Sequence, residues 1–523
     1  MATRPRGWNR RQWMATAAAS TAVTAQADAA VMADPAQPGK LYEALGVRPF
    51  INARGTFTIL TGSQSLPEVK QAMLEASRHY VHLDELMDAV GLRIAELTKA
   101  EWGIVTAGCA AAITHATSAC IAGMDPEKMQ RLPKLDGLKD QVVMPRYARN
   151  EYDHAARMLG VTMVEVETEE QLQAALGPRT AMVLILSCPA AEKGPLTIPV
   201  ICRIAREKNV PVLVDAAAET MTIPNIHLNH GATMVAYSGG KCMRGPQAAG
   251  LLLGPKDLLQ AAWLNSAPHH AFGRSLKVGK EEIMGMLAAL EAWVRRDHDA
   301  EWKQWEGWLE TIRKEASQVD GITSEILQPE DLSNHAPRLR LKWDAEKVGI
   351  TGQEVAKALD RGQPRIIVAG STGERPSRLA SSVTIMPYMM NPEDAPIVAQ
   401  ALHAALAHPP KVEPAPAATA APSAVAGRWT VNLQFFRGDA THELILEQDG
   451  ARLAGTHKTT WMSNPLRGEV TGAAVQFRSA HRYEGTVLNY VFEGKLEGET
   501  LRGEVRMGEY GTARWTASRV KPA

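Results

Sequence analysis

Residues 181–215 read AMVLILSCPA AEKGPLTIPV ICRIAREKNV PVLVD. Their two ends, residues 181–186 and 210–214, are short apolar runs of strand type, and residues 198–207 between them predict a helix. Two buried strands joined by a helix form a βαβ unit, which indicates a mostly parallel sheet covered on both faces. Outside this stretch, Leu66–His79 and Leu83–Thr98 predict amphipathic helices, and Gln141–Met144 predicts another buried strand. We therefore expect an α/β fold.

The composition is that of a globular protein. The 523 residues include 57 Lys and Arg against 57 Asp and Glu, with 45% hydrophobic and 22% charged residues, which excludes wholesale disorder, collagen and coiled coil. Zero net charge argues against a main role in nucleic-acid binding. No apolar run reaches the roughly 18 residues of a membrane span. The five cysteines include no C-x-x-C pair, and we predict no metal site.

The first 27 residues have the pattern of an export signal. They contain four arginines and no acidic residue, then a weakly apolar Ala/Thr-rich run that ends in Ala25-Gln26-Ala27. The adjacent Arg10 and Arg11 are typical of a twin-arginine signal, which exports folded proteins. We expect a signal over residues 1–27 and a periplasmic protein. The alternative is a disordered basic arm on a cytoplasmic protein.

A second boundary lies at residues 408–426, where Pro and Ala dominate and a semi-rigid linker is expected. Beyond it, residues 427–519 contain short runs with period-2 alternation, such as Thr430–Phe435, divided by turn signals such as Asp449-Gly450. This pattern predicts a small antiparallel β-barrel or sandwich. Its role stays open between a ligand cavity and a stabilising or oligomer-forming appendage. Its three histidines lack metal-ligand spacing.

Three predicted strand ends carry residues suited to chemistry. Residues 104–113 read IVTAGCAAAI, a strand, a Gly turn and a helix start that can bind phosphate. Val212–Asp215 ends in a carboxylate, which suits a metal, a ribose or a ring nitrogen, or simply caps the next helix. Residues 235–247 read VAYSGGKCMRGPQ, where Lys241 is either an amine nucleophile in a Gly-rich turn or a surface lysine. Ligands bind at the carboxyl ends of such strands.

The three segments together, in this order, resemble fold-type I pyridoxal-phosphate enzymes. Residues 238–247 are similar to the lysine segment of bacterial selenocysteine synthase (seryl-tRNA selenium transferase) and its relatives, as are residues 51–56 and 273–280. Gly240 departs from the Asp that those synthases tend to carry, and the segment looks more like the D-glucosaminate-6-phosphate ammonia-lyase branch. The resemblance implies a cofactor-binding large domain over residues 40–290, a small domain over 291–407, and a homodimer or larger homo-oligomer.

The resemblance also implies roles for individual residues. Lys241 would bind pyridoxal 5′-phosphate covalently, and Asp215 would pair with its ring nitrogen. The cofactor phosphate would be bound by the Ser238 hydroxyl and by backbone donors of Gly108, Cys109 and Ala110. For Cys109 the alternative role is a reactive thiol whose pKa is lowered at the helix start.

Substrate contacts are expected elsewhere. Arg365 is the candidate for binding a substrate carboxylate, since Arg binds one bidentately, and a surface ion pair is the alternative. Arg274 and Lys277 would meet a phosphate across a subunit interface, or simply lie at a solvated helix start. The loop 146–154 would cover one face of the cofactor ring, and the residue that stacks there stays open.

The implied electron sink places the chemistry at the α-carbon of a small, amino-acid-like substrate. The freed lysine would remove the α-proton, and loss of a β-hydroxyl would lead to ammonia release. Racemisation and transamination would also use Lys241 and Asp215, so these two residues do not decide the reaction. Because the lysine segment looks more like the ammonia-lyase branch, we favour elimination from an amino acid or amino-sugar acid. Selenium transfer to seryl-tRNA is disfavoured because the neutral chain lacks a basic field. The alternative to an enzyme is a non-catalytic binding protein on the same fold.

Overall fold

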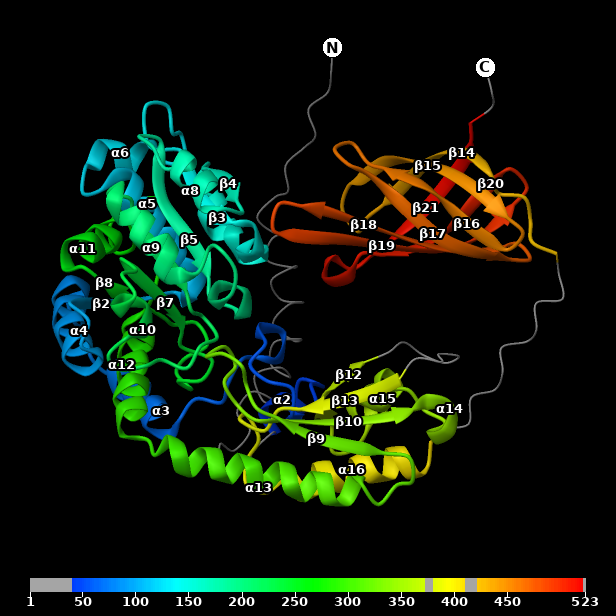
Figure 1. The fold of residues 1–523 in the computed structure, drawn as a ribbon, viewed down its shortest axis with the longest axis horizontal. Helices are drawn as coiled ribbons and strands as arrows, with labels where there is room; N and C mark the ends of the chain where they lie inside the picture. The colour runs from blue at the N-terminus through cyan, green and yellow to red at the C-terminus, as the bar shows by residue number, and fades with distance from the viewer. Residues whose placement is uncertain (1–39, 372–379, 410–420, 521–523) are drawn as a thin grey trace, which may run out of the picture.

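A computed structural model describes residues 40–371, 380–409 and 421–520. It shows a large α/β part, a small α/β part and a C-terminal barrel (Figure 1). The predicted signal and most of the predicted linker lie outside the described residues. None of the described helices is long and apolar enough to cross a membrane.

The large part is built on a seven-stranded sheet. Its strands are Trp102–Thr106 (β2), Gln141–Pro145 (β3), Thr162–Val166 (β4), Thr180–Leu186 (β5), Val212–Asp215 (β6), Met234–Ser238 (β7) and Gly250–Gly254 (β8). Their order is β2-β8-β7-β6-β5-β3-β4, and only β8 runs against its neighbours. The central strands are apolar and buried, as expected for a sheet covered on both faces. The predicted mostly parallel α/β sheet is confirmed.

Helices pack against this sheet and each other. The longer ones are Pro67–Ser77 (α3), Leu83–Thr98 (α4), Gly108–Ala122 (α5), Ile198–Glu207 (α9), Lys256–Leu264 (α11) and Lys280–Arg295 (α12). The shorter ones are Pro126–Arg131 (α6), His154–Arg157 (α7), Glu169–Ala175 (α8) and Ile226–Asn229 (α10). Helix α5 lies against five strands, and α9 connects β5 to β6 as the opening βαβ pattern predicted.

The small part combines an antiparallel sheet with helices. Its elements are His298–Ala316 (α13), Thr323–Leu327 (β9), Arg338–Asp344 (β10), Ala345–Val348 (α14), Gly352–Arg361 (α15), Ile366–Ile367 (β11), Ala369–Ser371 (β12), Ala380–Ile385 (β13) and Asp394–Ala407 (α16). The sheet order is β12-β13-β10-β9. The N-terminal strand Ile51–Asn52 (β1) pairs with β11, so an early segment of the chain completes this late part.

The C-terminal region is a closed barrel, which resolves the barrel-or-sandwich alternative. Its strands are Gly427–Gln434 (β14), Asp439–Asp449 (β15), Arg452–Lys458 (β16), Ser463–Thr471 (β17), Ala474–Tyr483 (β18), Thr486–Glu497 (β19), Thr500–Arg506 (β20) and Thr512–Arg519 (β21). Pairing of β14 with β21 closes it. The end with the β18–β19 turn points toward the large part (Figure 1).

Candidate active site

Three strand ends meet at one edge of the large sheet. The start of α5 follows β2, Asp215 ends β6, and Lys241 comes three residues after β7. The thiol of Cys109 donates to Oδ1 of Asp215 at 3.4 Å. The N–H of Ser238 donates to the carbonyl of Ala217, two residues beyond Asp215, at 3.3 Å. The structure therefore brings together Gly108, Cys109, Ala110, Asp215, Ser238 and Lys241.

Asp215 is buried, and its carboxylate accepts hydrogen bonds from the Ala217 N–H at 3.1 Å and from the Cys109 thiol. Burial raises the pKa of Asp215, although these hydrogen bonds and the nearby charge of Lys241 oppose the shift. No Lys, Arg or His among the described residues forms an ion pair with it. A buried carboxylate without an ion-pair partner suits a ligand that brings a protonated ring nitrogen.

The thiol of Cys109 is not activated. Burial, followed by the charge of Asp215, raises its pKa well above the usual value. This outweighs the helix-start effect that would lower a thiol pKa. The reactive-thiol alternative is therefore not supported, and Cys109 is a small buried residue beside Asp215.

The start of α5 fits a phosphate. Its N-cap residue, Ala107, forms no side-chain hydrogen bond to the first-turn N–H groups. Gly108 has a φ of +82°, and a Cβ built there would meet no atom within 4 Å, so the space beside it is open. Gly250 on β8 allows this approach, because its Cβ would lie 2.4 Å from the Gly108 carbonyl carbon. Unpaired N–H groups at the positive end of a fifteen-residue helix favour an anion.

Glycines shape the turn that carries Lys241. A Cβ on Gly240 would lie 2.6 Å from Cα of Gln247, and one on Gly239 would lie 2.9 Å from the carbonyl oxygen of Ala249. The turn thus folds back on itself more tightly than larger residues permit. Within the described part of the chain, Lys241 Nζ forms no hydrogen bond or ion pair. Its amine is available to a ligand.

The predicted substrate residues lie outside this group. Nε of Arg365 is 2.7 Å from Oδ1 of Asp360, and its guanidinium also contacts the carbonyl of Arg48 at 3.4 Å. This is the ion pair that the alternative interpretation of Arg365 described. Arg274 is exposed and donates to the carbonyl of Pro268 at 3.3 Å, and Lys277 is exposed in the same segment before α12. No described contact joins any of the three to Lys241.

The loop after β3 carries two tyrosines, Tyr147 and Tyr152. Tyr152 is half-exposed, and its pKa is raised mainly by burial and also by the charges of Glu151, Asp215 and Glu509. The hydroxyl of Tyr147 already has a partner within the protein, since it donates to the carbonyl of Leu196 at 2.7 Å. Tyr152 is therefore the candidate for the ring-covering side chain that the sequence left unassigned.

Sequence reasoning missed a buried network behind Asp215. His227 Nε2 lies 2.6 Å from Oε2 of Glu219, and the hydroxyl of Ser187 donates to the other carboxylate oxygen. The thiol of Cys242, next to Lys241, donates to the Glu219 carbonyl at 2.9 Å. Glu219 lies four residues after the strand-end Asp215, and this position could have indicated a role near the site. No feature of the sequence around His227 indicated that it is the partner of Glu219.

The barrel histidines also come together. His442 Nδ1 is 2.9 Å from His457 Nε2, and His457 Nδ1 is 3.0 Å from His481 Nε2. The three imidazoles thus follow one another in a chain. A ring nitrogen of one histidine faces a ring nitrogen of the next, and the nitrogens do not converge on one point. Across the described ranges, no group of three or more His, Cys, Asp or Glu is arranged to hold a metal ion.

Comparison with known proteins extends these observations. Residues 82–273 match the family model for class-V aminotransferases. D-glucosaminate-6-phosphate ammonia lyase of Salmonella typhimurium is 31% identical over 333 residues, covering 62% of this chain and 87% of the relative. 5′-C-glycyluridine monooxygenase-decarboxylase of a Streptomyces species is 28% identical, covering 62% and 83%. L-seryl-tRNA(Sec) selenium transferase of Moorella thermoacetica is 26% identical, covering 56% and 62%. A solved structure of D-glucosaminate-6-phosphate ammonia-lyase matches with a TM-score of 0.63 and 27% identity, covering 71% of this chain and 99% of that one.

Proposed function

Since this chain belongs to the class-V aminotransferase family of fold-type I, pyridoxal-phosphate-dependent proteins, we propose that it is an ammonia lyase acting on an amino acid or amino-sugar acid. The observation that carries the proposal is the convergence of Lys241, Asp215 and the uncapped start of α5 at one sheet edge. The similarity to an ammonia lyase over 87% of that protein's length supports the choice of reaction.

Each residue has a defined task in this proposal. The α5 N–H groups and the Ser238 hydroxyl hold the cofactor phosphate, and Asp215 holds the ring nitrogen in its protonated form. Bound pyridoxal phosphate supplies an electron sink for the negative charge that develops at the substrate α-carbon. Lys241 would hold the cofactor covalently until the substrate amine takes its place, and the freed Nζ would then be the base that accepts the α-proton. Tyr152 covers the site from the loop side.

The test is a panel of amino acids and amino-sugar acids, each assayed for 2-oxo acid and for ammonia. Equal amounts of both products from one substrate class support the ammonia-lyase function. Racemisation without ammonia, or dependence on an added 2-oxo acid acceptor, contradicts it and favours the racemase or aminotransferase alternative. A protein that binds no pyridoxal phosphate would contradict the enzyme function and favour the alternative of a non-catalytic binding protein on this fold.

A homodimer is part of the proposal. Exposed apolar side chains are frequent between residues 41 and 81, and Ile59 and Tyr80 are 87% and 101% exposed. Phe57 and Val81 lie beside them in sequence and are about half-exposed. Large apolar side chains that are exposed in this way favour a subunit contact. Light scattering on the wild type and on Tyr80→Glu tests it, with a smaller mass expected for the variant.

Export to the periplasm also remains a proposal, and it rests on the arginine pair at residues 10–11 and the Ala25-Gln26-Ala27 pattern. Cell fractionation of the wild type and of a variant with both arginines changed to lysine tests it. Retention of only the variant in the cytoplasm supports export by the twin-arginine route. Equal cytoplasmic retention of both proteins contradicts it.

A further inference from the structure

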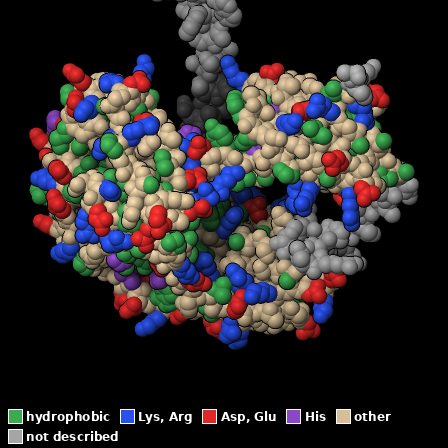
Figure 2. Space-filling view, turned by 45° about the horizontal axis from the view of Figure 1, so that its top comes forward, with side chains coloured by type: hydrophobic (Ala, Val, Ile, Leu, Met, Phe, Trp, Pro, Cys, Tyr) green, Lys and Arg blue, Asp and Glu red, His purple; other side chains and the backbone are tan. Residues whose placement is uncertain are grey.

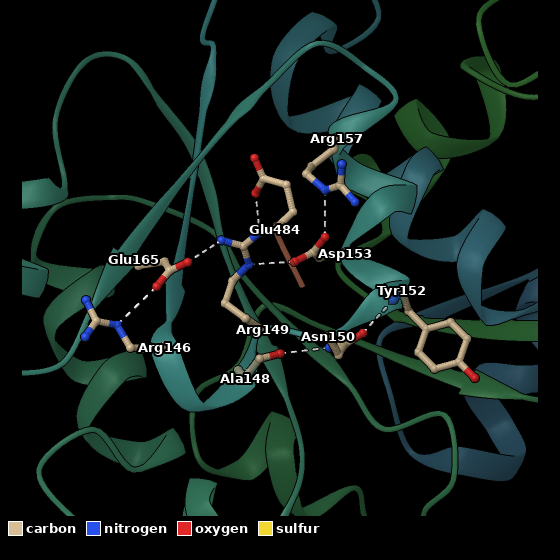
Figure 3. A network of polar contacts seen from close by, with 9 residues as sticks. All are labelled: Arg146, Ala148, Arg149, Asn150, Tyr152, Asp153, Arg157, Glu165 and Glu484. Carbon is tan, nitrogen blue, oxygen red and sulfur yellow. Dashed lines mark hydrogen bonds and ion pairs between the residues drawn. The ribbon is translucent and has the colours of Figure 1, made fainter. Parts of the chain in front are cut away.

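The β18–β19 turn of the barrel touches the loop that follows β3. Glu484 in this turn forms an ion pair with Arg149 (Figure 3). The next residue, Gly485, lies so close to the loop that a Cβ built on it would be 1.9 Å from the carbonyl oxygen of Asn150. A larger residue at this position would push the barrel and the loop apart. The glycine and the ion pair thus form one contact between distant parts of the chain.

Arg149 is the centre of this contact. Its side chain is only 2% exposed, and its guanidinium also binds Asp153 at 2.6 Å and Glu165 at 2.6 Å. Asp153 is buried and binds Arg157 at 2.8 Å (Figure 3). A buried guanidinium needs an acceptor for each group of N–H donors, and Glu484 provides the one for Nη2. Without Glu484, this nitrogen loses its acceptor in the network.

The backbone at Glu484 has an uncommon conformation. Glu484 and Gly485 form a two-residue turn between Tyr483 and Thr486, which pair with each other. Glu484 has a φ of 50°, in the region that Gly, Asn and Asp adopt more readily than Glu. Such outliers concentrate at functional positions, where the rest of the structure maintains them. Here the long acidic side chain reaches Arg149, which a shorter turn residue cannot do equally well.

The loop that Glu484 contacts is part of the candidate active site. It begins at the carboxyl end of β3, and Asn150 Oδ1 accepts a hydrogen bond from the Tyr152 N–H at 2.7 Å. A second barrel connection, the short helix Gly508–Tyr510 (η5), lies at the same end of the barrel, and the charge of Glu509 acts on Tyr152. Figure 2 shows a hollow between the barrel and the rest of the molecule, with Lys and Arg side chains along its rim.

We propose that the barrel forms one wall of the active site and that Glu484 is a positioning residue, which holds Arg149 and thereby keeps the loop with Tyr152 over the site. The role of Tyr152 rests on the proposed function, but the contact between barrel and loop does not. In this arrangement the barrel controls how substrate enters and is enclosed. No hydrogen bond or ion pair between described residues joins the barrel to Lys241 or Asp215.

Hydrogen exchange of the full-length protein tests the contact directly. Glu484→Asn removes the carboxylate but suits the left-handed turn, so the barrel keeps its fold. The matched control is Glu497→Asn, which removes an exposed ion pair to Arg502 at the other end of β19. We expect amides of residues 149–157 to exchange roughly tenfold faster in Glu484→Asn, because losing a hydrogen bond to a charged group changes an equilibrium by about that factor. The control should match the wild type.

Kinetics then separate positioning from chemistry. Once a substrate is found, Glu484→Asn should raise KM several-fold with little change in kcat, and Glu484→Gln, which keeps an acceptor oxygen at the distance that Glu reaches, should show a smaller change. Exchange in residues 149–157 that is equal in Glu484→Asn and wild type overturns the proposal. Faster exchange without any change in KM or kcat overturns the role in substrate entry. Absence of ammonia release from the wild type would contradict the proposed function and leave the exchange test intact.

Discussion

The thiol of Cys109 and the carboxylate of Asp215 lie 3.4 Å apart, although 106 residues separate them in the chain. Cys109 is in the first turn of α5 and Asp215 ends β6, so their contact joins the candidate phosphate site to the candidate ring site. The carboxylate accepts this hydrogen bond in the absence of a cationic partner from the described residues. Under the proposed function, this contact places the residues that would hold the cofactor phosphate next to the carboxylate that would pair with its ring nitrogen.

The thiol of Cys109 should be unreactive toward alkylating reagents. Because burial and Asp215 raise its pKa, the thiolate is scarce at neutral pH. We expect Cys109→Ala to keep activity within a few-fold of wild type, and we expect alkylating reagents to leave the wild-type activity intact. Mass mapping of alkylated cysteines checks this. Rapid modification of Cys109 together with loss of activity would show that the thiol is a nucleophile.

Replacement of Asp215 should abolish most activity. Asp215→Asn keeps the size of the side chain but removes the charge that stabilises a protonated ring nitrogen. We expect kcat to fall by about 10²–10³-fold, the usual loss when one preorganised electrostatic partner of a transition state is removed. Asp215→Glu should retain more activity than Asp215→Asn. Steady-state ammonia release measures both variants, and an Asn variant as active as wild type would exclude this role.

Gly250 offers a test of the phosphate cradle. In Gly250→Ala the new methyl group would lie 2.4 Å from the Gly108 carbonyl carbon, so the start of α5 must move. We expect pyridoxal-phosphate affinity to fall by about tenfold or more, a loss on the scale of one charged hydrogen bond. Gly177→Ala is the control, since a Cβ there meets no atom within 4 Å. Equilibrium dialysis of both variants against pyridoxal phosphate measures this affinity. An unchanged affinity in Gly250→Ala would show that the phosphate binds elsewhere.

The barrel should lose stability in mild acid. Burial lowers the pKa of His442 to about 4 and that of His457 to about 3, and it also lowers the pKa of His481. An unfolded histidine has a pKa of about 6.5, so below that value the unfolded chain binds more protons than the folded one. The free energy of unfolding should therefore fall between about pH 6.5 and pH 4, by up to about 1.4 kcal/mol per pH unit for each histidine.

Urea unfolding followed by tryptophan fluorescence, to which the buried Trp429 and Trp515 of the barrel contribute, measures this effect. His457→Gln should show a weaker dependence on pH than the wild type, because one neutral buried imidazole is removed. Equal unfolding free energies for the wild type at about pH 7 and about pH 5 would contradict the account.

Local patterns predicted the elements well, because helix and strand periodicity depends on neighbouring residues. The helix expected over Leu83–Thr98 is found with those bounds, and the strand expected over Gln141–Met144 extends by one residue. Closure of the barrel was not predictable, because it depends on the pairing of β14 with β21, whose partner residues lie 80 to 90 positions apart. Alternation along each strand is the same in a sandwich and a barrel.

The candidate site also has parts that the sequence predicted and parts that it could not predict. Lys241, Asp215 and the α5 start were found because each lies at a strand end, and parallel topology brings strand ends to one edge. Arg365 had no such constraint, and its partner Asp360 lies in the preceding helix α15. The ion pair between Arg149 and Glu484 joins residues 335 positions apart, in two parts of the chain with separate cores. Only the three-dimensional structure relates them.

The most direct test of the central claim is borohydride reduction of the purified protein, followed by peptide mapping. We expect the wild type to carry a visible absorbance that reduction bleaches and to retain a phosphopyridoxyl group on Lys241 alone. Lys241→Ala should carry no covalent label. A label on another lysine, or a wild type that remains colourless and unlabelled after incubation with pyridoxal phosphate, would contradict the assignment of Lys241 and of the site around it.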